Sequence, residues 1–467
     1  MDPIRRPRPQ RARALSQGDR PCWRAAGRHG GGQTGGVGVH TAAEGPKPGE
    51  RRRVTGTPAR FPDGFLWGTA SAAYQVEGGN QNCDWWEFER QPGRIANGDS
   101  AAVACDHYHR YREDFALLRQ MNQNAHRLSI EWSRIEPSRG EFDARQIRHY
   151  RDVLGELREQ GIQPMVTLHH FTSPLWFTRQ GGWDATGSAH AFMPFVHRVI
   201  DELGDLVGLW CTINEPNIYA ANGWMVGEFP PGRQGDVASA YRVTSNMRRA
   251  HELAYDAIKR RWPDASVGLS HHRFLMLPAS QKRRDRLAAR AAQLVLDQWP
   301  VAPGRLRKVV EAPGDYIGIA HYWGVMCAFD PRRPGGQFIR RFNVPGVPVT
   351  DMGWSADPSW MRAVLDELLP LKKPVYITEN GLASNDDEWR QRYLTDVLSN
   401  VRLAIDDGVD VRGYFHWTSL DNFEWARGYA MRFGLIEVDR KTLERRIKPS
   451  GRLYARIAQA NGLNPLH

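Results

Sequence analysis

A regular alternation of short β-prone runs with amphipathic helical stretches, which begins at Phe61, constrains the fold of this chain most. Eight runs are predicted strands: Phe65–Ser71, Asn124–Ile130, Gln163–His169, Val207–Ile213, Ala265–Ser270, Tyr316–Ala320, Pro374–Thr378 and Val411–Trp417. The helical patterns between them are Tyr111–Met121, Ala144–Gln160, Ala189–Leu203, Ser239–Arg261, Gln281–Leu296, Ser359–Leu369 and Trp389–Asp407. Eight strands that are each followed by a helix or a long loop predict an α/β fold, a single (β/α)8 TIM barrel, rather than two doubly wound domains.

Two glutamates come at the ends of predicted strands four and seven. Glu215 stands in the string Thr-Ile-Asn-Glu-Pro, and Glu379 stands in Ile-Thr-Glu-Asn-Gly. Because the carboxyl ends of barrel strands meet at one face, both side chains are expected in one cleft. Each glutamate alone is consistent with an ordinary salt bridge. Two rigidly held carboxylates in one cleft, however, are the minimal equipment for cleaving a glycosidic bond.

The basic charge of the chain is concentrated in residues 1–57. They hold eleven arginines and one lysine against four acidic residues, a local charge of +8 out of +11 for the whole chain. The rest of the chain is therefore nearly balanced, which argues against a nucleic-acid-binding face. The Arg-, Gly- and Pro-rich composition predicts a disordered extension over 1–57, followed by the barrel over 58–467. A basic docking arm and a gene start placed too far upstream stay open for this segment.

The spacing of the cysteines and the hydropathy of the chain indicate where the protein is expected to be located. The five cysteines are widely spaced and form no Cys-x-x-Cys pair, so neither a disulfide framework nor a zinc site is predicted. No apolar run is long enough to cross a membrane, and no signal-peptide pattern is present. The expected location is the cytoplasm, with no membrane partner.

Four segments carry a resemblance to a known family. They are Phe61–Gly78 (FPDGFLWGTASAAYQVEG), His126–Arg134 (HRLSIEWSR), Asp421–Trp425 (DNFEW) and Arg432–Leu435 (RFGL). In this order they resemble glycoside hydrolase family 1, the retaining β-glucosidase family, and the resemblance extends from about Phe61 to about Leu463.

The resemblance implies catalytic roles. Glu215 would be the general acid/base and Glu379 the nucleophile of a double displacement. Arg127 resembles the family arginine beside the nucleophile, where a cation lowers the pKa of Glu379. Tyr322 resembles the family tyrosine that hydrogen-bonds the nucleophile. One carboxyl group must be protonated while the other is ionised, so the two need different surroundings.

The resemblance also implies a sugar-binding set. Its hydroxyl partners are Gln75, His170, Asn214, Glu424 and Trp425, with Trp417 as the stacking platform. The adjacent pairs His169-His170 and His271-His272 make poor chelates, because neighbouring strand residues face opposite sides. No metal and no cofactor is expected.

One departure from the family pattern concerns predicted strand six. The family's Asn-Tyr-Tyr is replaced here by Ala320-His321-Tyr322. The tyrosine is kept, but the asparagine that helps orient the neighbourhood of the acid/base is absent. His321 or a water molecule is the expected substitute.

The expected function is that of a retaining exo-β-glycosidase acting on the non-reducing terminal β-D-glucosyl residue of a small β-glycoside or oligosaccharide. Galactosyl and fucosyl residues are further candidates. A 6-phosphorylated sugar is disfavoured because Glu424 would repel its phosphate, and the presence of Glu215 argues against a thioglucosidase. A transglycosylating enzyme of the same fold and a non-catalytic glycan-binding barrel stay as alternatives, and the oligomeric state stays open.

Overall fold

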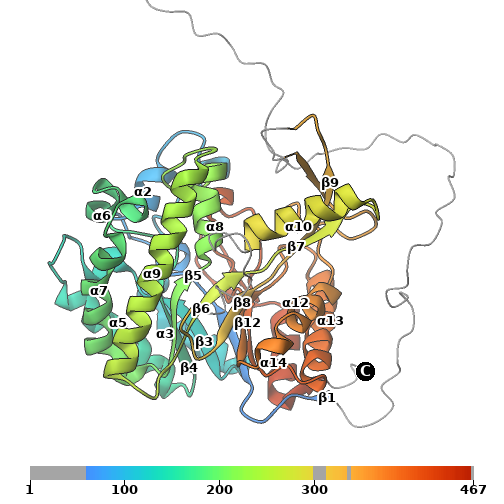
Figure 1. Cartoon of the computed structure of the whole chain (residues 1–467). Coiled ribbons are helices and arrows are strands. Elements are labelled where there is room, and N and C mark those ends of the chain that lie inside the picture. The colour runs from blue at the N-terminus through green and yellow to red at the C-terminus, as the bar shows by residue number, and fades with distance from the viewer. Residues whose placement is uncertain (1–58, 298–311, 334–337, 464–467) are drawn as a thin grey trace, which may run out of the picture. The chain divides into compact units, whose positions relative to one another are not determined.

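A closed barrel of eight parallel strands forms the centre of the computed structural model, which describes residues 59–297, 312–333 and 338–463 (Figure 1). The predicted disordered extension 1–57 lies outside the described residues. The strands follow one another around the barrel as β2 (Leu66–Ala70), β3 (Ala125–Ser129), β4 (Gln163–His169), β5 (Leu209–Asn214), β6 (Ser266–His272), β8 (Ile317–Ala320), β11 (Val375–Asn380) and β12 (Val411–Trp417). The predicted (β/α)8 fold is confirmed, and each predicted strand matches an observed one to within two residues at either end.

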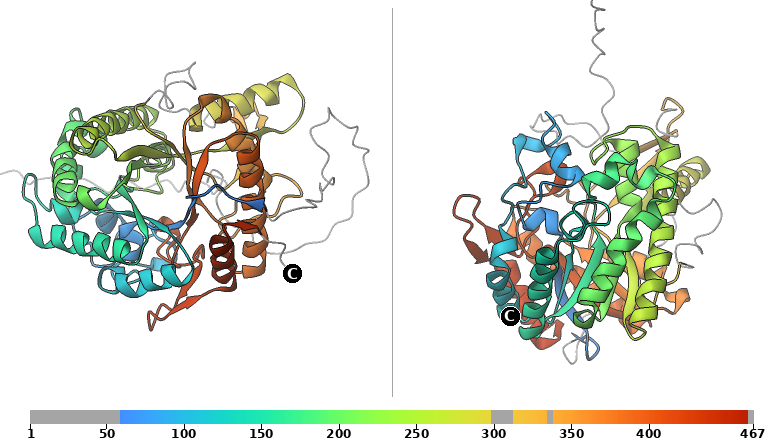
Figure 2. Two further views of the ribbon diagram at one scale, coloured as in Figure 1. Left: turned by 90° about the horizontal axis from the view of Figure 1, so that it is seen from below. Right: turned by 90° about the vertical axis from the view of Figure 1, so that its left-hand side faces the viewer.

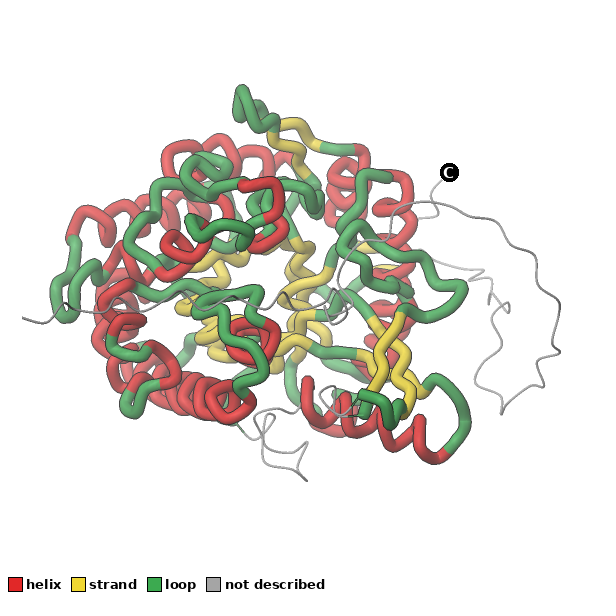
Figure 3. Tube along the Cα trace, turned by 90° about the horizontal axis from the view of Figure 1, so that it is seen from above, coloured by secondary structure: helices red, strands yellow, loops and turns green. Residues whose placement is uncertain are grey.

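Helices surround the barrel, as the end-on views in Figures 2 and 3 show. The longer ones are α3 (His107–Gln120), α5 (Ala144–Glu159), α7 (Ser188–Leu203), α9 (Val237–Arg261), α10 (Arg283–Asp297), α12 (Ser359–Asp366), α13 (Asp387–Asp406) and α14 (Pro449–Ala460). The shorter ones are α1 (Ala73–Val76), α2 (Asp84–Glu89), α4 (Trp132–Ile135), α6 (Leu175–Arg179) and α8 (Pro216–Ala220). All seven predicted helices are present.

Helix α5 illustrates how the sequence produces this outer layer. Asp143 caps its first turn by accepting a hydrogen bond from the backbone N–H of Arg145 at 2.8 Å. Its buried residues, which include Ile147, Tyr150 and Leu154, recur at three- and four-residue spacing. This spacing gives the helix one apolar face, which packs against the barrel.

Helix α14 has no counterpart among the predicted helices. Pro449 occupies its first turn, where the missing N–H costs nothing, and Asn461 ends it in the left-handed conformation with φ +45°. Tyr454 of this helix is fully buried and donates a hydrogen bond to the carbonyl oxygen of Gly68 in β2 at 2.9 Å. The helix therefore covers the place where the last strand pairs with the first.

Outside the barrel, the described residues form three small sheets. β7 (Leu275–Pro278), β9 (Gly324–Phe329) and β10 (Ile339–Phe342) form a three-stranded sheet against which α10 packs. β13 (Ile436–Val438) pairs with β14 (Arg445–Ile447), and β1 (Ala59–Arg60) pairs with β15 (Gly462–Leu463). None of the helices within the described ranges combines the length and the apolar character that a membrane span needs.

Candidate active site

Nine of the ten residues predicted for the site lie at or beyond the carboxyl ends of barrel strands, and Arg127 lies in the middle of β3. Arg127, Asn214, Glu379 and Trp417 belong to the strands themselves, whereas Glu215 directly follows β5. The others stand in the connections: Gln75 in α1 after β2, His170 after β4, Tyr322 after β8, and Glu424 and Trp425 after β12. Each of the ten is buried except Glu424, which is partly exposed. The parallel barrel thus gathers residues that are up to 350 positions apart in the chain, from Gln75 to Trp425.

Glu379 is held by one side chain from β3 and one from the connection after β8. Arg127 donates from Nη1 to Glu379 Oε1 at 2.5 Å, and the Tyr322 hydroxyl donates to Oε2 at 2.9 Å. Both carboxylate oxygens therefore accept a hydrogen bond, one of them from a cation. Such bonds favour the ionised form of the carboxyl group.

Arg127 connects Glu379 with the end of β5. Its Nη2 donates to Asn214 Oδ1 at 2.6 Å, and its Nε donates to Thr167 Oγ1 at 3.1 Å. The amide nitrogen of Asn214 lies 3.1 Å from His170 Nε2. The guanidinium is 1% exposed, so these neighbours replace the water that a charged group requires.

Glu215 adopts a backbone conformation that is rare for a residue with a side chain. Its φ of +39° lies in the left-handed region, between the last residue of β5 and Pro216, which opens α8. The amide N–H of Glu215 donates to the Ser270 carbonyl oxygen in β6 at 2.8 Å, which holds this bend in place. Strained backbone of this kind occurs preferentially at functional sites.

The side chain of Glu215 has a different environment from that of Glu379. Its Oε1 lies 2.7 Å from Nδ1 of His272, the last residue of β6. Burial lowers the pKa of His272 to about 3, so this partner is neutral. Glu215 thus faces a neutral imidazole, whereas Glu379 is paired with a guanidinium.

Burial dominates the pKa values of both carboxyl groups. Loss of hydration raises the pKa of Glu215 to about 8, and the charge of Arg127 opposes this only in part. Burial also raises the pKa of Glu379, to about 7, while Arg127 and Tyr322 lower it and the charge of Glu215 raises it further. Arg127 lowers the pKa of Glu379 as expected, but the effect of burial is larger. Of the two groups, Glu379 ionises at the lower pH.

A third carboxyl group and a set of aromatic rings form the other side of the site. Gln75 donates from Nε2 to the Phe423 carbonyl oxygen at 2.8 Å and to Glu424 Oε2 at 3.3 Å. Burial raises the pKa of Glu424 to about 8. The ring of His170 is nearly parallel to those of Trp417 and Trp425, with centroid distances of 5.7 and 6.1 Å.

The structure corrects the expectation for the Ala320 departure. The ring of His321 is turned to the backbone, with Nδ1 2.9 Å from the Arg273 carbonyl oxygen, so His321 does not substitute beside Glu215. The side chain that reaches Glu215 is that of His272 instead. Sequence reasoning considered His272 only as half of a metal-binding pair. Its position at the end of a strand next to the Glu215 strand was the signal that could have identified it.

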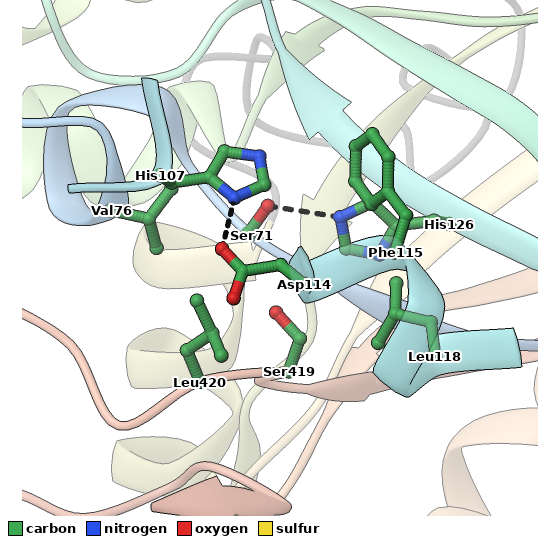
Figure 4. Close-up of a pocket in the computed structure, with 9 residues that line it drawn as sticks. All are labelled: Ser71, Val76, His107, Asp114, Phe115, Leu118, His126, Ser419 and Leu420. Atoms are coloured by element: carbon green, nitrogen blue, oxygen red, sulfur yellow. Dashed lines mark hydrogen bonds and ion pairs between the residues drawn. The ribbon is translucent and has the colours of Figure 1, made fainter. Parts of the chain in front are cut away.

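A separate small cavity lies behind the barrel wall (Figure 4). His107 and Asp114 contact each other there at 2.7 Å, and Ser71 Oγ lies 3.2 Å from His126 Nε2. Because His126 precedes Arg127 on β3, the two side chains point to opposite faces of the strand. The cavity thus lies between the barrel and α3 and includes none of the ten predicted residues. Within the described ranges, no three His, Cys, Asp or Glu side chains are grouped to hold a metal ion.

Two buried glutamates at the ends of the fourth and seventh strands of a (β/α)8 barrel supply the pair of carboxyl groups that most glycosidases use. Comparison with known proteins agrees. A family model described as glycosyl hydrolase family 1 matches residues 57–305 and 305–463. The chain belongs to glycosyl hydrolase family 1.

Named relatives of this chain are β-glucosidases. Beta-glucosidase A of Thermotoga maritima is 34% identical over 447 residues, which are 86% of this chain and 99% of that protein. Beta-glucosidase A of Acetivibrio thermocellus is 33% identical over 446 residues, with the same coverage of both chains. The protein is therefore a β-glycosidase.

Solved structures share the whole barrel. The β-glucosidase from Thermotoga maritima in complex with glucoimidazole matches with a TM-score of 0.82 at 32% identity, covering 87% of this chain and 100% of that one. The same enzyme in complex with galacto-hydroximolactam matches with a TM-score of 0.81 at the same identity and coverage.

Proposed function

We propose that this protein is a retaining exo-β-glycosidase that removes the non-reducing terminal β-D-glucosyl residue, with Glu379 as nucleophile and Glu215 as acid/base. The names of its β-glucosidase relatives support glucose as the preferred sugar. The galacto-configured ligand of one related structure supports β-galactosides as further substrates. β-Fucosides are proposed on the same grounds of sugar similarity.

The contrast between the two carboxyl environments carries this proposal. Glu379 accepts hydrogen bonds from Arg127 and Tyr322, which favour its ionised form, whereas the nearest polar partner of Glu215 is the neutral His272. Two glutamates whose surroundings separate their pKa values are suited to different roles. A double displacement also needs its carboxyl groups about 5–5.5 Å apart. The charge of Glu215 raises the pKa of Glu379, so the two carboxyl groups interact electrostatically.

In the first step, a Glu379 carboxylate oxygen attacks the anomeric carbon while the protonated Glu215 gives its proton to the glycosidic oxygen. The bond from the anomeric carbon to the leaving group breaks, and an ester to Glu379 forms. As Glu379 loses its negative charge, Arg127 keeps its contact with Asn214 and so stays in position.

In the second step, the ionised Glu215 takes a proton from a water molecule, whose oxygen attacks the anomeric carbon and releases Glu379. The sugar leaves with the configuration it had in the substrate. An alcohol that replaced this water would give transglycosylation, so the two activities share one intermediate.

Two buried polar atoms of the sugar-binding set lack partners. Gln75 Oε1 and His170 Nδ1 have no hydrogen-bond partner within the described residues. Buried polar atoms normally have partners, so we propose that a ligand hydroxyl reaches them after a small shift of the side chains that cover them. Trp417 and Trp425, whose rings are nearly parallel to that of His170, would offer apolar faces to the sugar ring.

Two substitutions test the assigned roles. Glu379→Ala should lower kcat for a dinitrophenyl β-glucoside by about 10⁴-fold or more, because no nucleophile remains. Glu215→Ala should lower kcat/KM about 10²- to 10⁴-fold for methyl β-glucoside but little for the dinitrophenyl substrate, whose leaving group needs no proton. Near-normal activity of Glu379→Ala, or equal losses for both substrates in Glu215→Ala, would refute the corresponding role.

A further inference from the structure

The contact between His272 and Glu215 is built into the barrel. His272 is 4% exposed and Glu215 is 5% exposed, and their side chains meet at 2.7 Å. β5 and β6 are hydrogen-bonded neighbours, with Asn214 in register with Ser270. The end of β6 therefore lies beside the residue that follows β5, and the contact does not depend on a surface loop.

Ala320 leaves room for this imidazole. In the register of β6 and β8, His272 pairs with Ala320, and on its other side Ala320 pairs with Glu379. Residues in regular register point to the same face of a sheet, so His272 and Ala320 face the same side, whereas the pair of Ala320 and Glu379 follows a shift in register. Ala320 is fully buried and has no side chain beyond Cβ, so it occupies little of that space. The His272 ring lies over Tyr322, with a centroid distance of 5.9 Å and an interplanar angle of 17°.

The groups around His272 determine which of its nitrogens carries the proton. The titratable or charged ones are Glu215 after β5, Glu379 on β11, His321 and Tyr322 after β8, and the adjacent Arg273. A neutral histidine has one N–H. Placed on Nδ1, this N–H is satisfied by Glu215 Oε1, whereas Nε2 has no hydrogen-bond partner within the described residues. An unpaired buried acceptor costs less than an unpaired buried N–H, which favours the proton on Nδ1.

We propose that His272 is a positioning residue for the acid/base: its Nδ1–H binds Glu215 Oε1 and so keeps the transferable proton on Oε2. This inference rests on the proposed role of Glu215. In the first step the Oε2 proton goes to the glycosidic oxygen and the Nδ1 proton stays on the ring. The carboxylate that forms then accepts the same hydrogen bond, now strengthened by charge. In the second step the proton from water returns to Oε2.

The inference predicts a leaving-group effect that a purely structural residue would not give. His272→Leu removes the donor, and kcat/KM for methyl β-glucoside should fall about 10- to 100-fold, with less than about a threefold change for the dinitrophenyl β-glucoside. His272→Asn places an amide N–H near the position of Nδ1 and should restore activity on the methyl glucoside.

The pH profile gives a second test. Because the lost bond stabilises the ionised Glu215, the basic limb of the kcat/KM profile should move to higher pH in His272→Leu.

The matched control is His321→Leu, which removes an equally buried histidine whose ring contacts the Arg273 backbone instead. Any loss in this variant should be the same for both substrates. Glu215→Ala is measured in parallel. If it shows the leaving-group effect and His272→Leu does not, the positioning role is overturned alone. If Glu215→Ala lacks the effect as well, the proposed function fails and this inference fails with it.

Discussion

At the scale of single residues, the charge of Glu379 reflects a competition. Burial raises its pKa, and the two hydrogen bonds from Arg127 and Tyr322 lower it. The sequence predicted both of these partners but not the outcome, because the extent of burial depends on how the whole barrel closes around the carboxyl group. Removing either hydrogen-bond partner should therefore raise the pKa of Glu379.

Tyr322→Phe should raise the pKa of Glu379, since the hydroxyl that stabilises its ionised form is lost. The acid limb of the kcat/KM profile should move to higher pH. A hydrogen bond to a charged group contributes about 1.5–3 kcal/mol, so activity at pH 6 should fall roughly tenfold or more. A pH series from 5 to 9 checks this. An acid limb that moves to lower pH would contradict the assignment.

His272 shows where residue-level prediction stopped. Its contact with Glu215 follows from the register of three neighbouring strands and from the small size of Ala320. A short stretch of sequence shows neither which strand residues are in register nor which side chain the small Ala320 makes room for. The ten predicted residues, by contrast, stand in segments that are informative by themselves, and the structure brings nine of them to one end of the barrel, where Arg127 contacts Glu379 from the middle of β3.

At the scale of elements, the strands were predictable because each is a short apolar run between helical patterns. Helix α14 was not predicted, although Pro449 and Asn461 mark its ends. The small sheet of β7, β9 and β10 was also not predicted, because its strands stand outside the alternation of barrel strands and helices. Distance along the chain is not the reason, since β12 and β2 pair from opposite ends of the barrel segment of the chain and were predicted, whereas β9 pairs with the next strand, β10.

The strand ends that hold the site tolerate little added volume. A methyl group on Gly381, two residues after Glu379, would lie 1.9 Å from the Trp417 carbonyl oxygen at the end of β12. Gly381→Ala should therefore displace one of these strand ends and destabilise the fold by about 1–3 kcal/mol. Because Glu379 and Trp417 both lie there, kcat should fall as well.

Gly155→Ala is the control for this prediction. Gly155 lies within α5, where an added Cβ meets nothing within 4 Å. This substitution should stabilise the protein by up to about 1 kcal/mol, since alanine favours the helix. Thermal unfolding of both variants, together with kcat, gives the comparison. A Gly381→Ala protein with unchanged stability and kcat would show that the strand ends accommodate the added methyl group without harm to the site.

At the scale of the whole molecule, the buried carboxyl groups of the site lower the stability of the folded protein as the pH rises above 4.5. The pKa of Glu215 rises from 4.5 to about 8 on folding, and that of Glu424 does the same. Between these pH values the folded protein holds protons that the unfolded chain releases. The contribution of each group to stability is therefore greatest below pH 4.5 and is lost as the pH rises towards 8.

Glu215→Gln removes one of these groups and keeps an oxygen for the His272 contact. Relative to the wild type, this variant should gain stability as the pH is raised from 5 to 8, by up to about 4 kcal/mol. Denaturant unfolding at several pH values measures the difference. A stability difference that stays constant over this range would contradict the raised pKa of Glu215.

Glu379 and Glu215 are proposed to act together in a retaining double displacement. Proton NMR of the first sugar released from an aryl β-glucoside, recorded before mutarotation, tests this most directly. Two successive inversions at the anomeric carbon should give β-glucose as the first product. α-Glucose as the first product would mean a single displacement by water, and Glu379 could not then be the nucleophile.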